Sequence, residues 1–153
     1  MRRLILEAMG SCYNSVVVDA PVDRVWLVVR DFHRLDWAGP IVMDVRKVGP
    51  LKGTEVGAER VVNGLLHEKL LVLDDNSREV TYRMLDGPGP VAREFVSHYV
   101  ATFRVRPVTV SNTTFVEVVS TFEAKDEAAV DDLVNPIYSE ILEHLARFFA
   151  SGG

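Results

Sequence analysis

Hydrophobic positions follow two different periods along this chain. Apolar residues recur at i, i+3, i+4 and i+7 from Val22 to Val29, and a similar rhythm runs from Val130 to Phe148. Both patterns predict a helix with one buried side. Between them, short runs alternate apolar and polar residues and are separated by Gly, Pro, Asn and Asp, which is typical of strands and turns. This order of elements predicts an α+β fold.

Seven strands are expected, and the turns between most of them are short enough to make the sheet antiparallel. They cover residues 13–18, 41–48, 57–62, 65–73, 80–85, 93–105 and 113–122. Pro21 suits the first turn of the opening helix, and a second helical turn is expected at 33–37. In the closing segment Pro136 predicts a break, with a short helix to Val134 and a main helix that has Asn135 as its N-cap.

Composition narrows the class of protein. The 153 residues predict one domain at 11–150 after an N-terminal extension at 1–10. The net charge is −5 and the basic residues are scattered, which argues against nucleic-acid binding. No apolar run reaches the ~18 residues of a membrane span. The single Cys12 and an N-terminal apolar run that stops at Glu7 predict a cytoplasmic protein.

Metal and cofactor sites are not expected. The four histidines have no metal-ligand spacing, and no glycine-rich phosphate loop precedes a helix. His98 and His144 are expected to face solvent, and Cys12 to be a small buried residue.

Several ordered motifs resemble a known family. They are Ala20-Pro21-Val22-Asp23-Arg24-Val25-Trp26, Arg30-Asp31-Phe32, Gly57-Ala58-Glu59-Arg60 and Glu68-Lys69-Leu70. Together they resemble the polyketide cyclase/dehydrase branch of the START-like, Bet v 1-like superfamily (SRPBCC), from about Ser11 to Phe149. The resemblance implies a helix-grip fold, with a seven-stranded antiparallel sheet wrapped around a long C-terminal helix and two short helices after the first strand. It also implies a hydrophobic cavity. The ligands of this cavity differ among members of the superfamily, and a minority of the members are enzymes.

Two charged residues stand among apolar neighbours on their strands. Burying Arg60 and Glu68 is costly unless they pair, so we expect them to face each other in the interior. A strict two-residue turn at Asn63-Gly64 would instead pair Arg60 with His67. The sequence therefore predicts a three-residue loop centred on Gly64, which aligns Arg60 with Glu68.

The same two residues resemble the catalytic arginine and glutamate of the lachrymatory factor synthases of this branch. Tyr82 and Tyr99 resemble two tyrosines in the cavity of those enzymes. The loop between the arginine and glutamate strands is shorter here, so the substrate need not carry over. Trp37 and Phe103 complete the expected lining, and residues 87–90 are expected to form a lid.

Three functions stay open at this point. The first is binding of a small hydrophobic, oxygen-bearing molecule such as a lipid or polyketide, oriented by Arg60, Glu68, Tyr82 and Tyr99. The second is an enzyme of the cyclase, dehydratase or isomerase type, in which Glu68 moves a proton and Arg60 stabilises negative charge. The third is an interaction module, whose mark would be an exposed apolar patch that this alternation does not show. A purely structural ion pair is the alternative for Arg60 and Glu68, and a homodimer is also left open.

Overall fold

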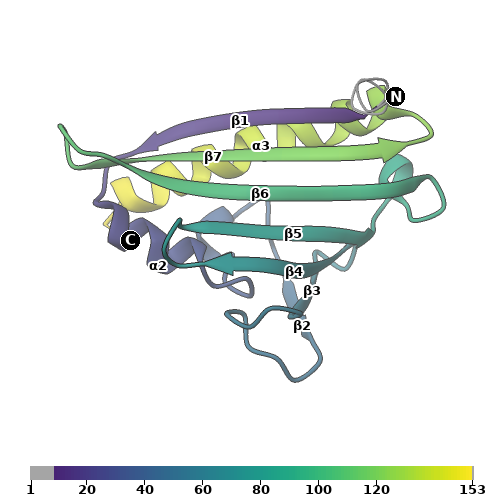
Figure 1. Ribbon diagram of the computed structural model, residues 1–153, viewed down its shortest axis with the longest axis horizontal. Coiled ribbons are helices and arrows are strands. Elements are labelled where there is room, and N and C mark those ends of the chain that lie inside the picture. Colours follow the sequence, from purple (N-terminus) through teal and green to yellow (C-terminus); the bar gives the residue numbers. More distant parts are fainter. Residues whose placement is uncertain (1–8, 153) are drawn as a thin grey trace.

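In a computed structural model of the protein, residues 9–152 are described, and they form a curved antiparallel sheet with a long helix across one face (Figure 1). The sheet has seven strands in the order β1-β7-β6-β5-β4-β3-β2. Its strands are β1 (Gly10–Val18), β2 (Val45–Val48), β3 (Glu59–Val62), β4 (Leu66–Asp74), β5 (Glu79–Asp86), β6 (Val96–Val108) and β7 (Thr113–Ala124). The helices are α2 (Val22–Val29) and α3 (Glu127–Ala150), with 3-10 turns η1 (Asp36–Ala38) and η2 (Gly89–Val91). The predicted helix-grip fold is confirmed.

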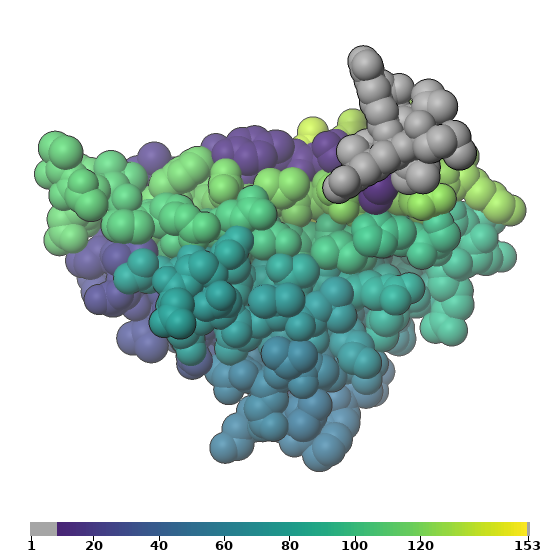
Figure 2. All heavy atoms as spheres, viewed as in Figure 1, coloured from purple at the N-terminus to yellow at the C-terminus, as the bar shows by residue number. Residues whose placement is uncertain are grey.

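The long helix α3 packs against β1 and β7 and against both 3-10 turns, while α2 lies on β6 and β7. The core between these layers contains the inward side chains of the strands and the buried stripe of α3. Cys12 is part of this core, as expected. The loop between β2 and β3 projects away from the sheet at one end of the molecule (Figures 1 and 2).

Three elements are shorter than the sequence predicts, and one of them is β3, which was expected at 57–62 and begins at Glu59. The expected strand at 41–48 begins only at Val45, because the side chain of Asn63 binds the backbone of the residues before it. Asn63 Oδ1 accepts from the N–H groups of Met43 and Asp44, and its Nδ2 donates to Ile41 O. The second helical turn, expected at 33–37, is the single 3-10 turn at Asp36–Ala38.

The predicted break in the closing helix is wrong. Helix α3 runs without interruption from Glu127 to Ala150, with Pro136 inside it. Its N-cap is Asp126, whose side chain accepts from Ala129 N, so Asn135 caps nothing. Pro136 is exposed, and so is Asp132, whose carbonyl loses its helical donor to the proline. Water can hydrate that carbonyl, which is why the helix tolerates the proline.

The expected N-terminal extension at 1–10 lies mostly outside the described residues, and Gly10 already opens β1. None of the helices within residues 9–152 is long and apolar enough to cross a bilayer.

Candidate functional site

The hairpin between β3 and β4 sets the register of the site. Arg60 pairs with Glu68 and Val62 pairs with Leu66, so the loop contains three residues, 63–65. Asn63 and Gly64 have positive φ angles of 54° and 68°, and Leu65 N donates to Val62 O at 3.0 Å. The extra residue keeps Arg60 and Glu68 on one face. This prediction is confirmed, and His67 faces the other way.

Arg60 and Glu68 form a buried ion pair, with 7% and 4% of their surface exposed. Arg60 Nε and Nη2 both lie 2.8 Å from Glu68 Oε1. Arg60 Nη1 donates to Phe32 O at 2.6 Å, and the guanidinium carbon lies 3.8 Å from the centre of the Phe32 ring. The cation is therefore neutralised on one side and covered by an aromatic face on the other.

Three tyrosines add a chain of hydroxyl groups. Tyr82 and Tyr99 lie on β5 and β6 with their side chains buried. Both hydroxyls contact the hydroxyl of Tyr138 on α3, at 3.1 Å from Tyr82 and 2.6 Å from Tyr99. Sequence reasoning missed Tyr138. Its signal was present, because position 138 lies four residues after Val134 and four before Leu142, on the buried side of the helix.

All three phenols are held in their protonated form. Burial is the main cause that raises the pKa of Tyr82 and Tyr138 well above the ordinary value. Burial also raises the pKa of Tyr99, and the negative charge of Glu68 adds to the effect on Tyr82 and Tyr99. At neutral pH each of these side chains is thus a hydrogen-bond donor as well as an acceptor.

These groups line a cavity of about 300 Å³ between the sheet, α3 and the segment after α2. Most of its wall is apolar, and it includes Trp37 and Phe103 as the sequence predicts. Trp37 is fixed by its Nε1, which donates to Arg34 O at 3.1 Å. In the segment expected to be a lid, Pro88 forms part of the wall. All six candidate residues named from the sequence therefore face one hollow, although their roles stay predictions.

Comparison with known proteins gives the family. Residues 9–149 match the family described as polyketide cyclase / dehydrase and lipid transport. The chain belongs to this family. The match includes the whole sheet and every residue of the site, and the family description implies binding of hydrophobic ligands. A search of curated proteins found no match.

Solved structures of similar proteins agree with this assignment. A protein of Nitrosospira multiformis is 39% identical, with a TM-score of 0.88, and the match covers 93% of this chain and 97% of that one. A protein of Thermobifida fusca is 25% identical, with a TM-score of 0.78 and coverage of 92% and 93%. Norcoclaurine synthase from Thalictrum flavum is 18% identical, with a TM-score of 0.69 and coverage of 93% and 87%, and shares the fold alone.

The histidines of this polyketide cyclase/dehydrase family member lie away from the cavity wall. His144 is 9% exposed, so the expectation that it faces solvent is wrong. It flanks the buried stripe of α3, and its Nε2 lies 3.6 Å from Glu140 Oε1. His98 is half-buried on the outer side of the sheet. Within residues 9–152 no three His, Cys, Asp or Glu side chains gather as metal ligands.

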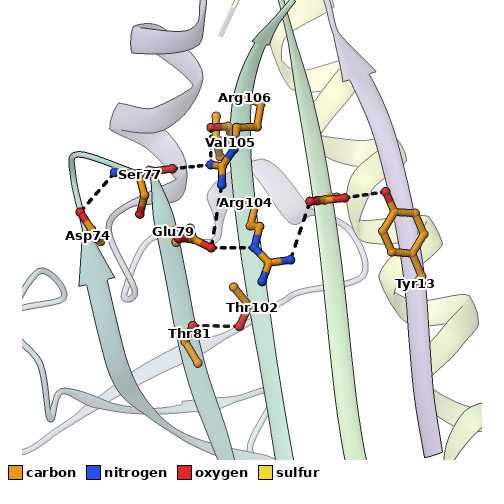
Figure 3. Close-up of polar contacts among 10 residues, drawn as sticks. Tyr13, Asp74, Ser77, Glu79, Thr81, Thr102, Arg104, Val105 and Arg106 are labelled. Carbon is orange, nitrogen blue, oxygen red and sulfur yellow. Dashed lines mark hydrogen bonds and ion pairs between the residues drawn. The ribbon is translucent and has the colours of Figure 1, made fainter.

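The outer face of the sheet carries a separate polar network (Figure 3). Arg104 donates to Glu79 at 2.6 Å and lies 3.8 Å from Glu117, which accepts from Tyr13 at 2.5 Å. Arg106 donates to Ser77 O. Arg104 follows the cavity-lining Phe103 in β6, so alternation directs it to the opposite face. Within residues 9–152, this family member thus has a buried Arg–Glu pair on the cavity face of its sheet and a network of Arg104, Arg106, Glu79 and Glu117 on the outer face.

Proposed function

We propose that the cavity binds one small, largely apolar molecule that carries oxygen, such as a lipid or a polyketide. The observation that carries this proposal is the hollow itself, in which a buried Arg–Glu pair and three tyrosine hydroxyls converge among apolar side chains. Its volume of about 300 Å³ lies at the lower end of the range for small-molecule sites.

Two further observations support binding. The family description names polyketides and lipids. A structure of norcoclaurine synthase with the same fold, 18% identical to this chain, is in complex with dopamine and hydroxybenzaldehyde. The single described cysteine, Cys12, is buried and free of a disulfide, which is consistent with the cytoplasmic location expected from the sequence.

An enzyme of the cyclase, dehydratase or isomerase type is the second candidate. The observation that favours it is Glu68 Oε2, which accepts no hydrogen bond from any residue within 9–152. A carboxylate with one free oxygen in a mostly apolar site can act as a general base. In this reading Arg60 stabilises developing negative charge, as the resemblance to the lachrymatory factor synthases implies. The N–H groups of Arg60 that point at Glu68 and Phe32 already donate hydrogen bonds there, however, so they are not available to a substrate.

Native mass spectrometry of the protein purified from its own host tests the binding proposal. We expect a bound small molecule that is released on denaturation. Val134→Trp should fill the cavity and abolish the bound mass, because Val134 lines the wall. Val110→Trp is the matched control, since Val110 is fully exposed. Protein that carries no small molecule, or bound mass that survives Val134→Trp, would argue against the proposal.

Glu68→Gln separates binding from catalysis once a ligand is known. The change keeps the size of the side chain and removes its charge and basicity. Turnover that disappears while affinity stays nearly the same supports the enzyme. Equal loss of affinity and turnover, or no turnover by either form, supports binding alone. Circular dichroism and thermal unfolding of both proteins show whether the variant is folded.

A further inference from the structure

The charges and hydrogen-bonding groups of the cavity wall narrow the class of ligand, and this inference rests on the proposed function. We propose that the ligand is an uncharged molecule with a free hydroxyl group, an alcohol or a phenol, and that the cavity rejects carboxylates.

Among residues 9–152, each cation of the cavity wall already has an acidic partner. The charged residues of this wall are two of each sign: Asp31, Arg34, Arg60 and Glu68. Arg60 is paired with Glu68, and Arg34 donates to Asp36 at 2.8 Å with 40% of its side chain exposed. A ligand carboxylate would lose its hydration without gaining an unpaired positive charge, and it would also meet the charge of Glu68. The ligand is therefore uncharged.

The free oxygen of Glu68 requires a hydrogen-bond donor. Both contacts from Arg60 reach Oε1, and no residue within 9–152 donates to Oε2. A buried carboxylate oxygen that loses water and finds no donor is costly. Ethers, ketones and esters cannot donate to it, whereas alcohols and phenols can. The group that lies against Glu68 therefore carries an O–H.

The tyrosines supply the complementary donor. Tyr82, Tyr99 and Tyr138 have three hydroxyl protons, and two hydrogen bonds join them. One proton is left over whichever way the two bonds point, because each hydroxyl donates once. The Ser120 hydroxyl is a further side-chain hydrogen-bond partner of Tyr99 and can donate to it, which still leaves one proton of the three tyrosines unused. A hydroxyl group is both a donor, as Glu68 needs, and an acceptor, as the spare tyrosine proton needs.

A series of ligands with one ring system tests this inference. The dissociation constants of β-naphthol, its methyl ether, naphthalene and β-naphthoate are measured at neutral pH by calorimetry. We expect β-naphthol to bind roughly 10- to 100-fold more tightly than its methyl ether, because the ether leaves a buried charged acceptor unpaired. β-Naphthoate should bind more weakly than all three uncharged compounds.

A pair of double variants assigns the preference to the site. Arg60→Met/Glu68→Leu removes the buried ion pair and the acceptor, so the ratio between β-naphthol and its methyl ether should fall toward unity. Arg104→Met/Glu79→Leu makes the same chemical changes on the outer face, where these two residues are paired. The control should keep the preference of the unmodified protein. An unchanged ratio in the cavity variant would overturn the role of Glu68.

The outcomes separate this inference from the proposed function. Equal affinity for β-naphthol, its methyl ether and naphthalene would overturn the hydroxyl requirement while upholding a binding cavity. Tightest binding of β-naphthoate would also overturn it and would likewise uphold the cavity. If none of the four compounds binds, the hydroxyl inference fails. The proposed function is then judged separately, by whether native mass spectrometry finds a small molecule bound to the protein from its own host.

Discussion

Removing one partner of the Arg60–Glu68 pair should destabilise the protein far more than removing both. The two side chains are 8% and 5% exposed, and both close contacts are 2.8 Å long. Glu68→Leu alone leaves a buried guanidinium without an anionic partner, with its hydrogen bond to Phe32 O and its contact with the Phe32 ring, and Arg60→Met alone leaves a buried carboxylate. Each single change should lower the free energy of unfolding by about 3–5 kcal/mol. The double variant, with apolar side chains of similar volume, should lie near the unmodified protein or above it.

Urea unfolding followed by the fluorescence of Trp26 and Trp37 measures these free energies. The coupling energy of the double-mutant cycle is the decisive quantity, because it isolates the interaction between the two side chains. Arg104 and Glu79 form the comparison cycle. Their side chains are 37% and 27% exposed, so screening by water should hold each single change to about 1 kcal/mol or less.

One result would refute the reasoning. If Glu68→Leu and Arg60→Met each cost less than about 1 kcal/mol, as expected for the outer pair, the two charges are not desolvated. The electrostatic basis for rejecting carboxylate ligands would then fail as well, since it depends on the same burial.

Three further predictions concern other parts of the fold. Deleting Leu65 should keep the free energy of unfolding within about 1 kcal/mol, because a two-residue Asn63-Gly64 turn then pairs Val62 with Leu66 and leaves Arg60 opposite Glu68. A loss as large as that of a broken ion pair would contradict this. Burial and the nearby Asp131 raise the pKa of the Cys12 thiol to about 12. A disulfide reagent at mildly alkaline pH should therefore leave the folded protein unmodified and react once it is denatured. The raised pKa of Tyr138 means that above about pH 10 the unfolded chain loses a proton that the folded protein keeps, so stability falls as the pH rises. Tyr138→Phe should make this fall shallower in urea titrations across that range, and an unchanged slope would mean that the phenol is not buried.

Burial arguments predicted the register of the β3–β4 hairpin, where turn chemistry alone would have failed. Asn-Gly favours a strict two-residue turn, which would send Glu68 to the outer face and leave Arg60 without a partner. The cost of an unpaired buried charge outweighs the preference of the turn. The three-residue loop at 63–65 could thus be derived from the sequence.

Other features could not be derived because they depend on contacts between distant segments. Asn63 was interpreted only as a turn residue, yet its side chain binds the backbone around Met43 and shortens β2. His144 was expected in solvent because it stands beside the exposed Glu143, but its position at the edge of the buried stripe decides its burial. Pairwise spacing along one helix does not reveal how wide the covered face is.

The continuous helix α3 brings the missed Tyr138 to the site. Val134, Tyr138 and Leu142 share the buried side of α3, and this holds only if the helix keeps its phase through Pro136. A break at Asn135 would rotate Tyr138 relative to Val134, although its spacing to Leu142 would still place it on the apolar side of the later helix. Pro136 lies on the exposed side, where water can satisfy the carbonyl that its ring leaves without a donor. The helix can therefore remain continuous, and it carries the central hydroxyl to the two tyrosines of the sheet.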